Sequence, residues 1–93
     1  MIRRLLRSNA FVRSAKRLIR KNPHLATDLK TSLEILTEDA FHPLLKTHKL
    51  KGELENSWAC SAGYALRIVF QFVRFEDKEA ILLEAIGTHD EVY

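Results

Sequence analysis

The chain has 93 residues, of which 46% are hydrophobic and 29% are charged, and a formal net charge of +3. This length predicts a single domain over residues 1–93 with a thin core, because so short a chain buries only about 60–65% of the surface that it exposes when unfolded. No apolar run approaches the roughly 20 residues that a bilayer span requires, which excludes a transmembrane helix.

The single cysteine, Cys60, excludes an internal disulfide, and no Cys/His cluster has the spacing of a zinc site. We therefore expect a cytoplasmic protein that uses neither a metal nor another cofactor. Cys60 lies within the strand-like stretch 58–61, where a half-buried structural thiol is a better interpretation than a nucleophile.

The positive charge is concentrated at the start of the chain. Residues 1–27 hold eight of the 15 basic residues and none of the 12 acidic ones. Such a segment favours a polyanion or an acidic protein as partner. It also resembles a mitochondrial transit peptide, but a domain this small needs the segment for its fold.

The first third of the sequence predicts a strand followed by two helices. Residues 2–6 are typical of a short strand, and Ser8 suits the N-cap of a helix because its hydroxyl accepts an otherwise unpaired amide. Apolar residues then recur at helical spacing, with basic residues around the other side. The apolar set is Phe11, Ala15, Leu18 and Ile19, and the basic set is Arg13, Lys16, Arg17 and Arg20.

The second helix is expected to begin at Asn22-Pro23, with Asn22 as its cap and Pro23 in the first helical position. Its leucines follow at intervals of four, four and three and carry the helix to about Asp39. They are Leu25, Leu29, Leu33 and Leu36. Two helices joined by so short a connection form a hairpin.

The rest of the chain predicts a lysine-rich loop and an antiparallel meander. The loop opens at His42-Pro43 and closes at Gly52. Strands are expected near 58–61, over 64–73 and over 80–86, with a polar turn at 76–78, and Gly87 is expected to break the pattern. The fold class is therefore α+β, in the order β-α-α-β-β-β, with one sheet face on the helices and the other free to bind a partner.

The second half of the chain holds side chains suited to metal-free RNA cleavage. That reaction needs a group that takes the proton of a 2′-hydroxyl, a cation that stabilises the phosphate, and a group that protonates the leaving 5′-oxygen. Histidine suits the proton transfers, arginine the phosphate, and aromatic rings the stacking of bases. The candidates are His48, Arg67, His89 and Tyr93. Arg67 also has the strand parity of the sheet face away from the helices.

Each candidate also has a purely structural interpretation. His48 and the lysines around it are more often a solvated loop, and Arg67 is more often an ion-pair partner. His89 would then cap the hairpin, and Tyr93 would pin the end of the chain by packing. Spacing alone leaves these alternatives open.

Three segments in this order resemble the YafQ-like branch of the bacterial RelE/ParE toxin superfamily, over essentially the whole chain. Residues 45–52 (LKTHKLKG) resemble the KxHxLxG segment of YafQ-like toxins. Residues 63–71 (GYALRIVFQ) resemble the YRLVYQ strand of the wider RelE group, with Arg67 at its arginine. Residues 86–93 (IGTHDEVY) resemble the terminal GTHxxxY/F and EVY patterns.

The resemblance implies a RelE-like fold and the toxin of a type II toxin–antitoxin system. Such a toxin is a ribosome-dependent, metal-independent mRNA endoribonuclease that inhibits translation. By position, His48 and His89 become the acid and base candidates, in either order. Arg67 becomes the phosphate-binding cation and Tyr93 the aromatic that orients the target nucleotide. Ribosome and mRNA would contact the basic side chains of the loop and the first helix, namely Lys46, Lys49, Lys51, Arg13, Lys16, Arg17 and Arg20.

The sequence departs from the YafQ-like pattern at Ser61 and Ala65, where a histidine and an aspartate are usual, and it lacks the paired lysines of RelE near Trp58. These departures leave two other functions open. One is a ParE-like, non-enzymatic inhibitor of DNA gyrase, and the other is a decayed toxin that only binds its antitoxin.

The expected partner is a cognate antitoxin with an acidic, partly disordered segment. This segment would fold on the basic helix surface, the open sheet face or both. No membrane contact is expected, and reading of operator DNA is assigned to the antitoxin rather than to this chain alone.

Overall fold

In the computed structural model, residues 2–52 and 56–88 are described, and they form two helices beside a five-stranded sheet. The elements in chain order are β1 (Arg4–Arg7), α1 (Asn9–Lys21), α2 (Leu25–Glu38), the 3-10 helix η1 (Pro43–Leu45), β2 (His48–Lys49), β3 (Trp58–Ala62), β4 (Leu66–Phe75) and β5 (Lys78–Thr88). The α+β class predicted from the sequence is confirmed.

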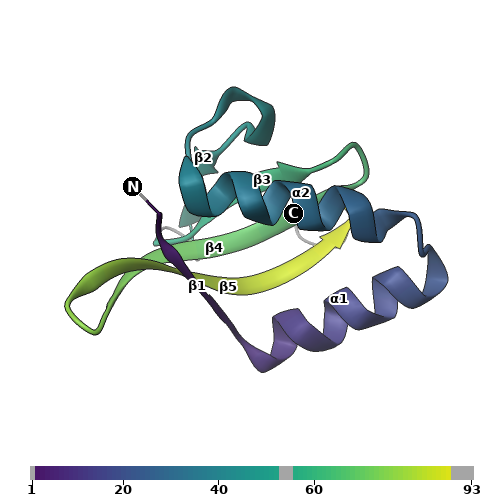
Figure 1. Ribbon diagram of the computed structural model, residues 1–93, viewed down its shortest axis with the longest axis horizontal. Coiled ribbons are helices and arrows are strands. Elements are labelled where there is room, and N and C mark those ends of the chain that lie inside the picture. Colours follow the sequence, from purple (N-terminus) through teal and green to yellow (C-terminus); the bar gives the residue numbers. More distant parts are fainter. Residues whose placement is uncertain (1, 53–55, 89–93) are drawn as a thin grey trace.

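The sheet has the strand order β1-β5-β4-β3-β2, so the first strand of the chain lies beside the last (Figure 1). The predicted antiparallel meander is the unit β3-β4-β5. Two edge strands extend it: β1, which runs parallel to β5, and β2, which is antiparallel to β3. The sequence placed β2 in a loop, because two residues are too few to show the alternation of a strand.

Both helices cover one face of the sheet and bury their apolar sides against it (Figure 1). β4 supplies Leu66, Ile68 and Phe70 at alternate positions, each at most 1% exposed. From α2, Leu29 and Leu36 pack on the same cluster. Full burial of a side chain of this size contributes about 1.5–3 kcal/mol, so this one layer of contacts dominates the stability of the fold. Neither helix in the described part of the chain is long and apolar enough to cross a membrane.

Ser8 caps α1, as predicted, and also ties that helix to the sheet. Its Oγ accepts a hydrogen bond from the Phe11 amide at 3.0 Å and donates one to the Glu84 carbonyl at 3.0 Å. The first bond satisfies an amide that has no partner within the helix. The second joins the start of α1 to β5, which lies far away in sequence.

The turn between the helices differs from its prediction. Asn22 was expected to cap α2, but it is the C-cap of α1, and its amide donates to the Leu18 carbonyl at 2.9 Å. α2 begins two residues later than expected, at Leu25, after His24. The amide of Asn22 is committed to closing α1, so the helical turn of α2 starts only after Pro23. The predicted end of α2 near Asp39 is confirmed.

β5 continues through Gly87 to Thr88, so the prediction that Gly87 breaks the strand is wrong. Gly87 pairs with Arg67 of β4, and this ladder holds the glycine in an extended conformation. Further along the hairpin, Val69 pairs with Ala85 while Phe70 pairs with Leu83. Glu84 is therefore the additional residue of a β-bulge.

Replacing Ser8 by alanine should lower the free energy of unfolding by about 0.5–2 kcal/mol, because the cap of α1 and its link to β5 are lost together. Urea denaturation followed by circular dichroism measures this. Ser14→Ala, which removes a hydroxyl from the interior of α1, is the matched control. Equal urea concentrations at the midpoint of unfolding for the two variants would contradict the capping role.

Cys60 is buried on the helix side of the sheet, and burial raises the pKa of its thiol from 9.0 to about 12, with nearby Arg67 acting in the opposite direction. The unfolded chain therefore loses this proton at a lower pH than the folded chain. We expect the free energy of unfolding to fall between about pH 9 and pH 12, by up to about 1.4 kcal/mol per pH unit. Denaturation at several alkaline pH values measures the slope, and Cys60→Ala should remove this component of it.

Candidate functional site

The sheet face away from the helices carries a small apolar cluster of its own. Its members are Leu50, Ala59 and Val69, with the half-buried Ala85 packed beside them. The cluster is too small to receive another layer of the fold, so the surrounding polar side chains stay accessible. This cluster, called the apolar floor below, lies beneath them.

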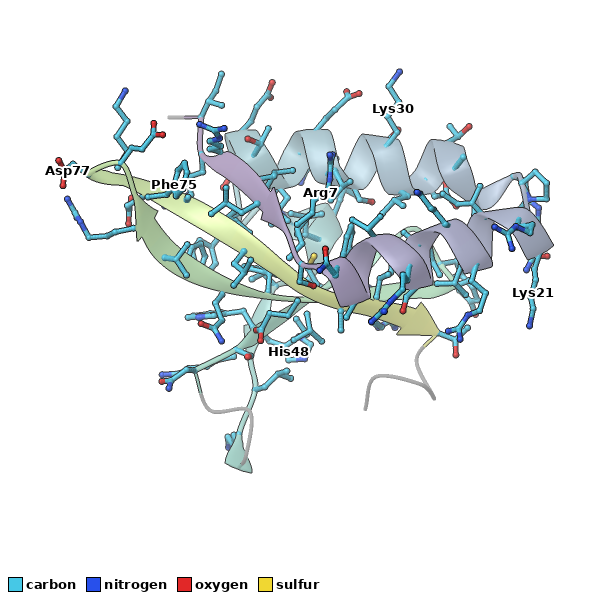
Figure 2. The ribbon with its side chains drawn as sticks, turned by 90° about the horizontal axis from the view of Figure 1, so that it is seen from below. Arg7, Lys21, Lys30, His48, Phe75 and Asp77 are labelled. Atoms are coloured by element: carbon cyan, nitrogen blue, oxygen red, sulfur yellow. The ribbon has the colours of Figure 1, made fainter. Side chains whose placement is uncertain are left out.

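His48 lies on this open face. It pairs with Ala59 across β2 and β3, and Ala59 in turn pairs with Val69 of the apolar floor. Residues directly opposite one another in an antiparallel pair point to the same side of the sheet. Figure 2 shows His48 on the side of the sheet opposite to the two helices. The predicted catalytic histidine is therefore exposed and held by a strand rather than by a loop.

Arg67 also belongs to the open face, as its strand parity predicts. It stands two residues before Val69 in β4 and pairs with Ser61 on one side and Gly87 on the other. Its guanidinium Nη1 donates to the Leu66 carbonyl at 3.1 Å, which limits the directions that the head group can take. Strand spacing places the backbones of His48 and Arg67 roughly 12 Å apart.

A groove of about 640 Å³ opens beside Arg67. Lys46, Ser61 and Arg67 line one side of it. Ser61 and Arg67 pair directly across β3 and β4, and Lys46 lies at the end of η1, just before β2. Residues of α2 form the other side, including Asp28 and Thr31. The groove is of the size of small-ligand sites, which span roughly 300–1,000 Å³.

The ring of His48 is oriented by the segment that precedes it. Its Nδ1 lies 3.0 Å from the Lys46 carbonyl oxygen. A carbonyl can only accept, so Nδ1 carries the hydrogen and Nε2 is the nitrogen that can take up a proton. Lys46 adopts a left-handed conformation with φ of 51°, which turns the chain from η1 into β2. That turn aims the carbonyl at the ring.

The remaining predicted site residues fall into three groups. Lys49 and Lys51 are exposed on either side of the buried Leu50 and close to His48 in sequence. The basic residues of α1 are also exposed, but they belong to the helix layer and not to the groove; they are Arg13, Lys16, Arg17 and Arg20. His89 and Tyr93 lie outside the described residues. β5 ends at Thr88, which pairs with Leu66, the neighbour of Arg67.

Sequence reasoning missed the α2 side of the groove. Asp28, Thr31 and Ser32 line it together with Ile35. Their spacing of three, one and three is helical, so a polar stripe beside the leucine stripe was visible in the sequence. Tyr64, at the turn between β3 and β4, also lines the groove and is 100% exposed. Over residues 2–52 and 56–88, no group of three His, Cys, Asp or Glu side chains could hold a metal ion.

No family model matches the sequence, and no curated protein matches it either. Solved structures do match. YafQ from E. coli strain BL21(DE3) superposes with a TM-score of 0.78 at 16% identity, covering 98% of both chains. In the E. coli DinJ–YafQ toxin–antitoxin complex, YafQ gives 0.76 at 17% identity, covering 100% of this chain and 99% of that one.

Two further structures agree with this result. The YoeB/ParE toxin from Agrobacterium tumefaciens has a TM-score of 0.76 at 14% identity and covers 92% of this chain and 98% of its own. A metal-bound toxin from Helicobacter pylori has a TM-score of 0.73 at 27% identity and covers both chains completely. The chain therefore has the fold of the YafQ and YoeB/ParE toxins, which confirms the resemblance that its three sequence motifs indicate.

Proposed function

We propose that this chain is the toxin of a type II toxin–antitoxin system and that it blocks translation by cutting mRNA on the ribosome, in the cytoplasm and without a metal. The observation that carries this proposal is the placement of His48 and Arg67 on one open sheet face, with Arg67 also lining a groove that contains Lys46. An imidazole and a guanidinium on one accessible surface supply two of the three groups that metal-free cleavage of a phosphodiester needs, the base and the phosphate-binding cation.

Arg67 stabilises the scissile phosphate. The attack of the 2′-oxygen on phosphorus places additional negative charge on the non-bridging oxygens, and a guanidinium matches two of them at once. Its hydrogen bond to the Leu66 carbonyl holds it in place before the substrate arrives. Lys46, which lines the same groove, adds a second positive charge for a neighbouring phosphate.

His48 takes the proton of the 2′-hydroxyl through Nε2. The bond of Nδ1–H to the Lys46 carbonyl fixes this tautomer, and the same carbonyl stabilises the imidazolium that forms. His89 then supplies the proton for the leaving 5′-oxygen. It follows Thr88 directly in the sequence, and Thr88 ends β5 opposite Leu66. Tyr93 orients the target nucleotide, in the role that its sequence motif implies.

The partner that silences this activity is an acidic antitoxin. The solved DinJ–YafQ complex supports a protein partner for a chain of this fold. The acid-free segment 1–27, with the exposed cations of α1, suits a negatively charged peptide. The same cations, together with Lys49 and Lys51, would contact ribosomal RNA once the antitoxin is removed.

A ParE-like inhibitor of DNA gyrase is the second candidate. One observation favours it: the position in line with Arg67 is Ser61, a side chain that does not transfer protons near neutral pH. Induced expression distinguishes the two functions. A block of translation with truncated mRNA supports the nuclease, whereas a DNA-damage response with intact mRNA supports the inhibitor.

Replacing His48 or Arg67 by alanine should each slow mRNA cleavage by about 10²–10⁴-fold, since each change removes a group that acts in the transition state. Primer extension on mRNA after induced expression measures cleavage. His24→Ala, which removes an exposed histidine at the start of α2, should cut normally. Cleavage at the original rate by a His48→Ala/His89→Ala double variant would sink the mechanism.

Ribosome binding should weaken steeply with salt, because phosphate contacts release counterions. Removing three cations of α1 with Arg13→Ala, Lys16→Ala and Arg20→Ala should reduce the slope of log K against log salt by about 2, because each phosphate that a cation neutralises adds roughly 0.7–0.9 to that slope. Sedimentation with 70S ribosomes at several salt concentrations gives this slope. Lys30→Ala is the control, because Lys30 lies on α2 and not on α1 (Figure 2). It should leave the slope unchanged. An unchanged slope in the triple variant would remove α1 from the ribosome interface.

A further inference from the structure

The groove beside Arg67 has two chemically different sides. One side carries the cations Lys46 and Arg67, and the α2 side carries the carboxylate of Asp28 with the hydroxyls of Thr31 and Ser32. A nucleotide has the same division, with a phosphate at one end and a base edge of donors and acceptors at the other. The cations match the phosphate, which leaves the base edge to α2.

Tyr64 closes the groove at the turn between β3 and β4. Its side chain is 100% exposed, so the ring gains nothing from packing within the described chain. An aromatic ring with a free face beside two cations is the arrangement on which proteins stack unpaired bases. The ring and the hydrogen-bonding groups of α2 line the same cavity.

Gly63 positions the carboxylate of Asp28 at this turn. A Cβ added at Gly63 would lie 2.6 Å from the Asp28 Oδ2, closer than atoms approach in proteins. Gly63 also has a φ of 72°, which other residues adopt at a cost. The turn therefore combines two features: a glycine that lets the carboxylate approach the backbone, and an aromatic residue directly after it.

We propose that this groove binds a guanine nucleotide of the RNA, with the base stacked on Tyr64 and its edge read by Asp28. This inference rests on the proposed function and adds a base preference to it. A carboxylate only accepts hydrogen bonds. Guanine presents two adjacent donors, N1–H and N2–H, that fit both carboxylate oxygens, while adenine, cytosine and uracil present one donor group beside an acceptor.

The test is an NMR titration of the ¹⁵N-labelled full chain with the four ribonucleoside 3′-monophosphates. Guanosine 3′-monophosphate should shift the amides of Thr31, Gly63 and Tyr64, and it should bind about tenfold or more tightly than the other three, as expected for charge-assisted hydrogen bonds. Equal affinities for the four nucleotides, or shifts confined to other parts of the chain, would overturn the proposal. So would the absence of any shift at the groove amides.

Two variants separate stacking from base reading. Tyr64→Ala should weaken the binding of all four nucleotides by about tenfold, and Tyr64→Phe should retain it. Asp28→Asn should abolish the preference for guanosine and leave the other affinities nearly unchanged. Phe75→Ala and Glu34→Gln, an exposed aromatic and an exposed carboxylate outside the groove, are the matched controls. A preference for guanosine that survives Asp28→Asn would contradict the assigned reading.

The outcome is independent of cleavage, because nucleotide binding needs neither His48 nor a ribosome. A chain that binds guanosine 3′-monophosphate in the groove but leaves mRNA intact would contradict the proposed nuclease and support this inference. A chain that cuts mRNA but shows no shift of its groove amides with any of the four nucleotides would support the proposed nuclease and contradict this inference.

Discussion

The register of hydrogen bonds between β3, β4 and β5 is the constraint on which the rest of this protein depends. Side chains alternate between the two faces of a strand, so a slip of one residue would exchange the core with the candidate site. In the observed register, Ile68 and Phe70 meet the helices while Arg67 and Val69 face outward. Burial of the apolar stripe beneath α1 and α2 fixes this register. The free energy that stabilises the fold thus also determines which polar groups remain accessible.

The sequence was most informative where apolar periodicity was long. The ten residues of β4 and the leucines of α2 predicted their elements and their buried sides, because each pattern repeats several times. Ser8 was also predicted, since a capping hydroxyl acts on amides within one helical turn. Short or non-local features were missed. β2 has two residues, and its existence depends on pairing with β3, which follows only after the intervening segment.

In the candidate site too, local features could be predicted from the sequence and contacts between distant parts of the chain could not. The outward direction of Arg67 followed from parity alone, whereas its nearness to α2 did not, because that contact joins parts of the chain far apart in sequence. Asp28 carried no motif, and Tyr64 lay in the 63–71 segment without an assigned role, so both were found only through the groove that they line. The role of the Lys46 backbone was equally invisible, since a carbonyl that orients a histidine ring leaves no mark on residue type. Sequence similarity selected the candidate catalytic groups, and geometry identified what surrounds those within the described residues.

The bulge at Glu84 changes which residues of β5 face the helices. Before it, Ile81 and Leu83 contact the helices, and after it Ile86 does, so the strand changes from odd to even positions on the buried side. Without that shift, Ile86 would stand opposite Arg67 and cover the guanidinium with a branched side chain. With it, the residue opposite Arg67 is Gly87. One inserted residue thus places a glycine, rather than a branched side chain, directly opposite Arg67.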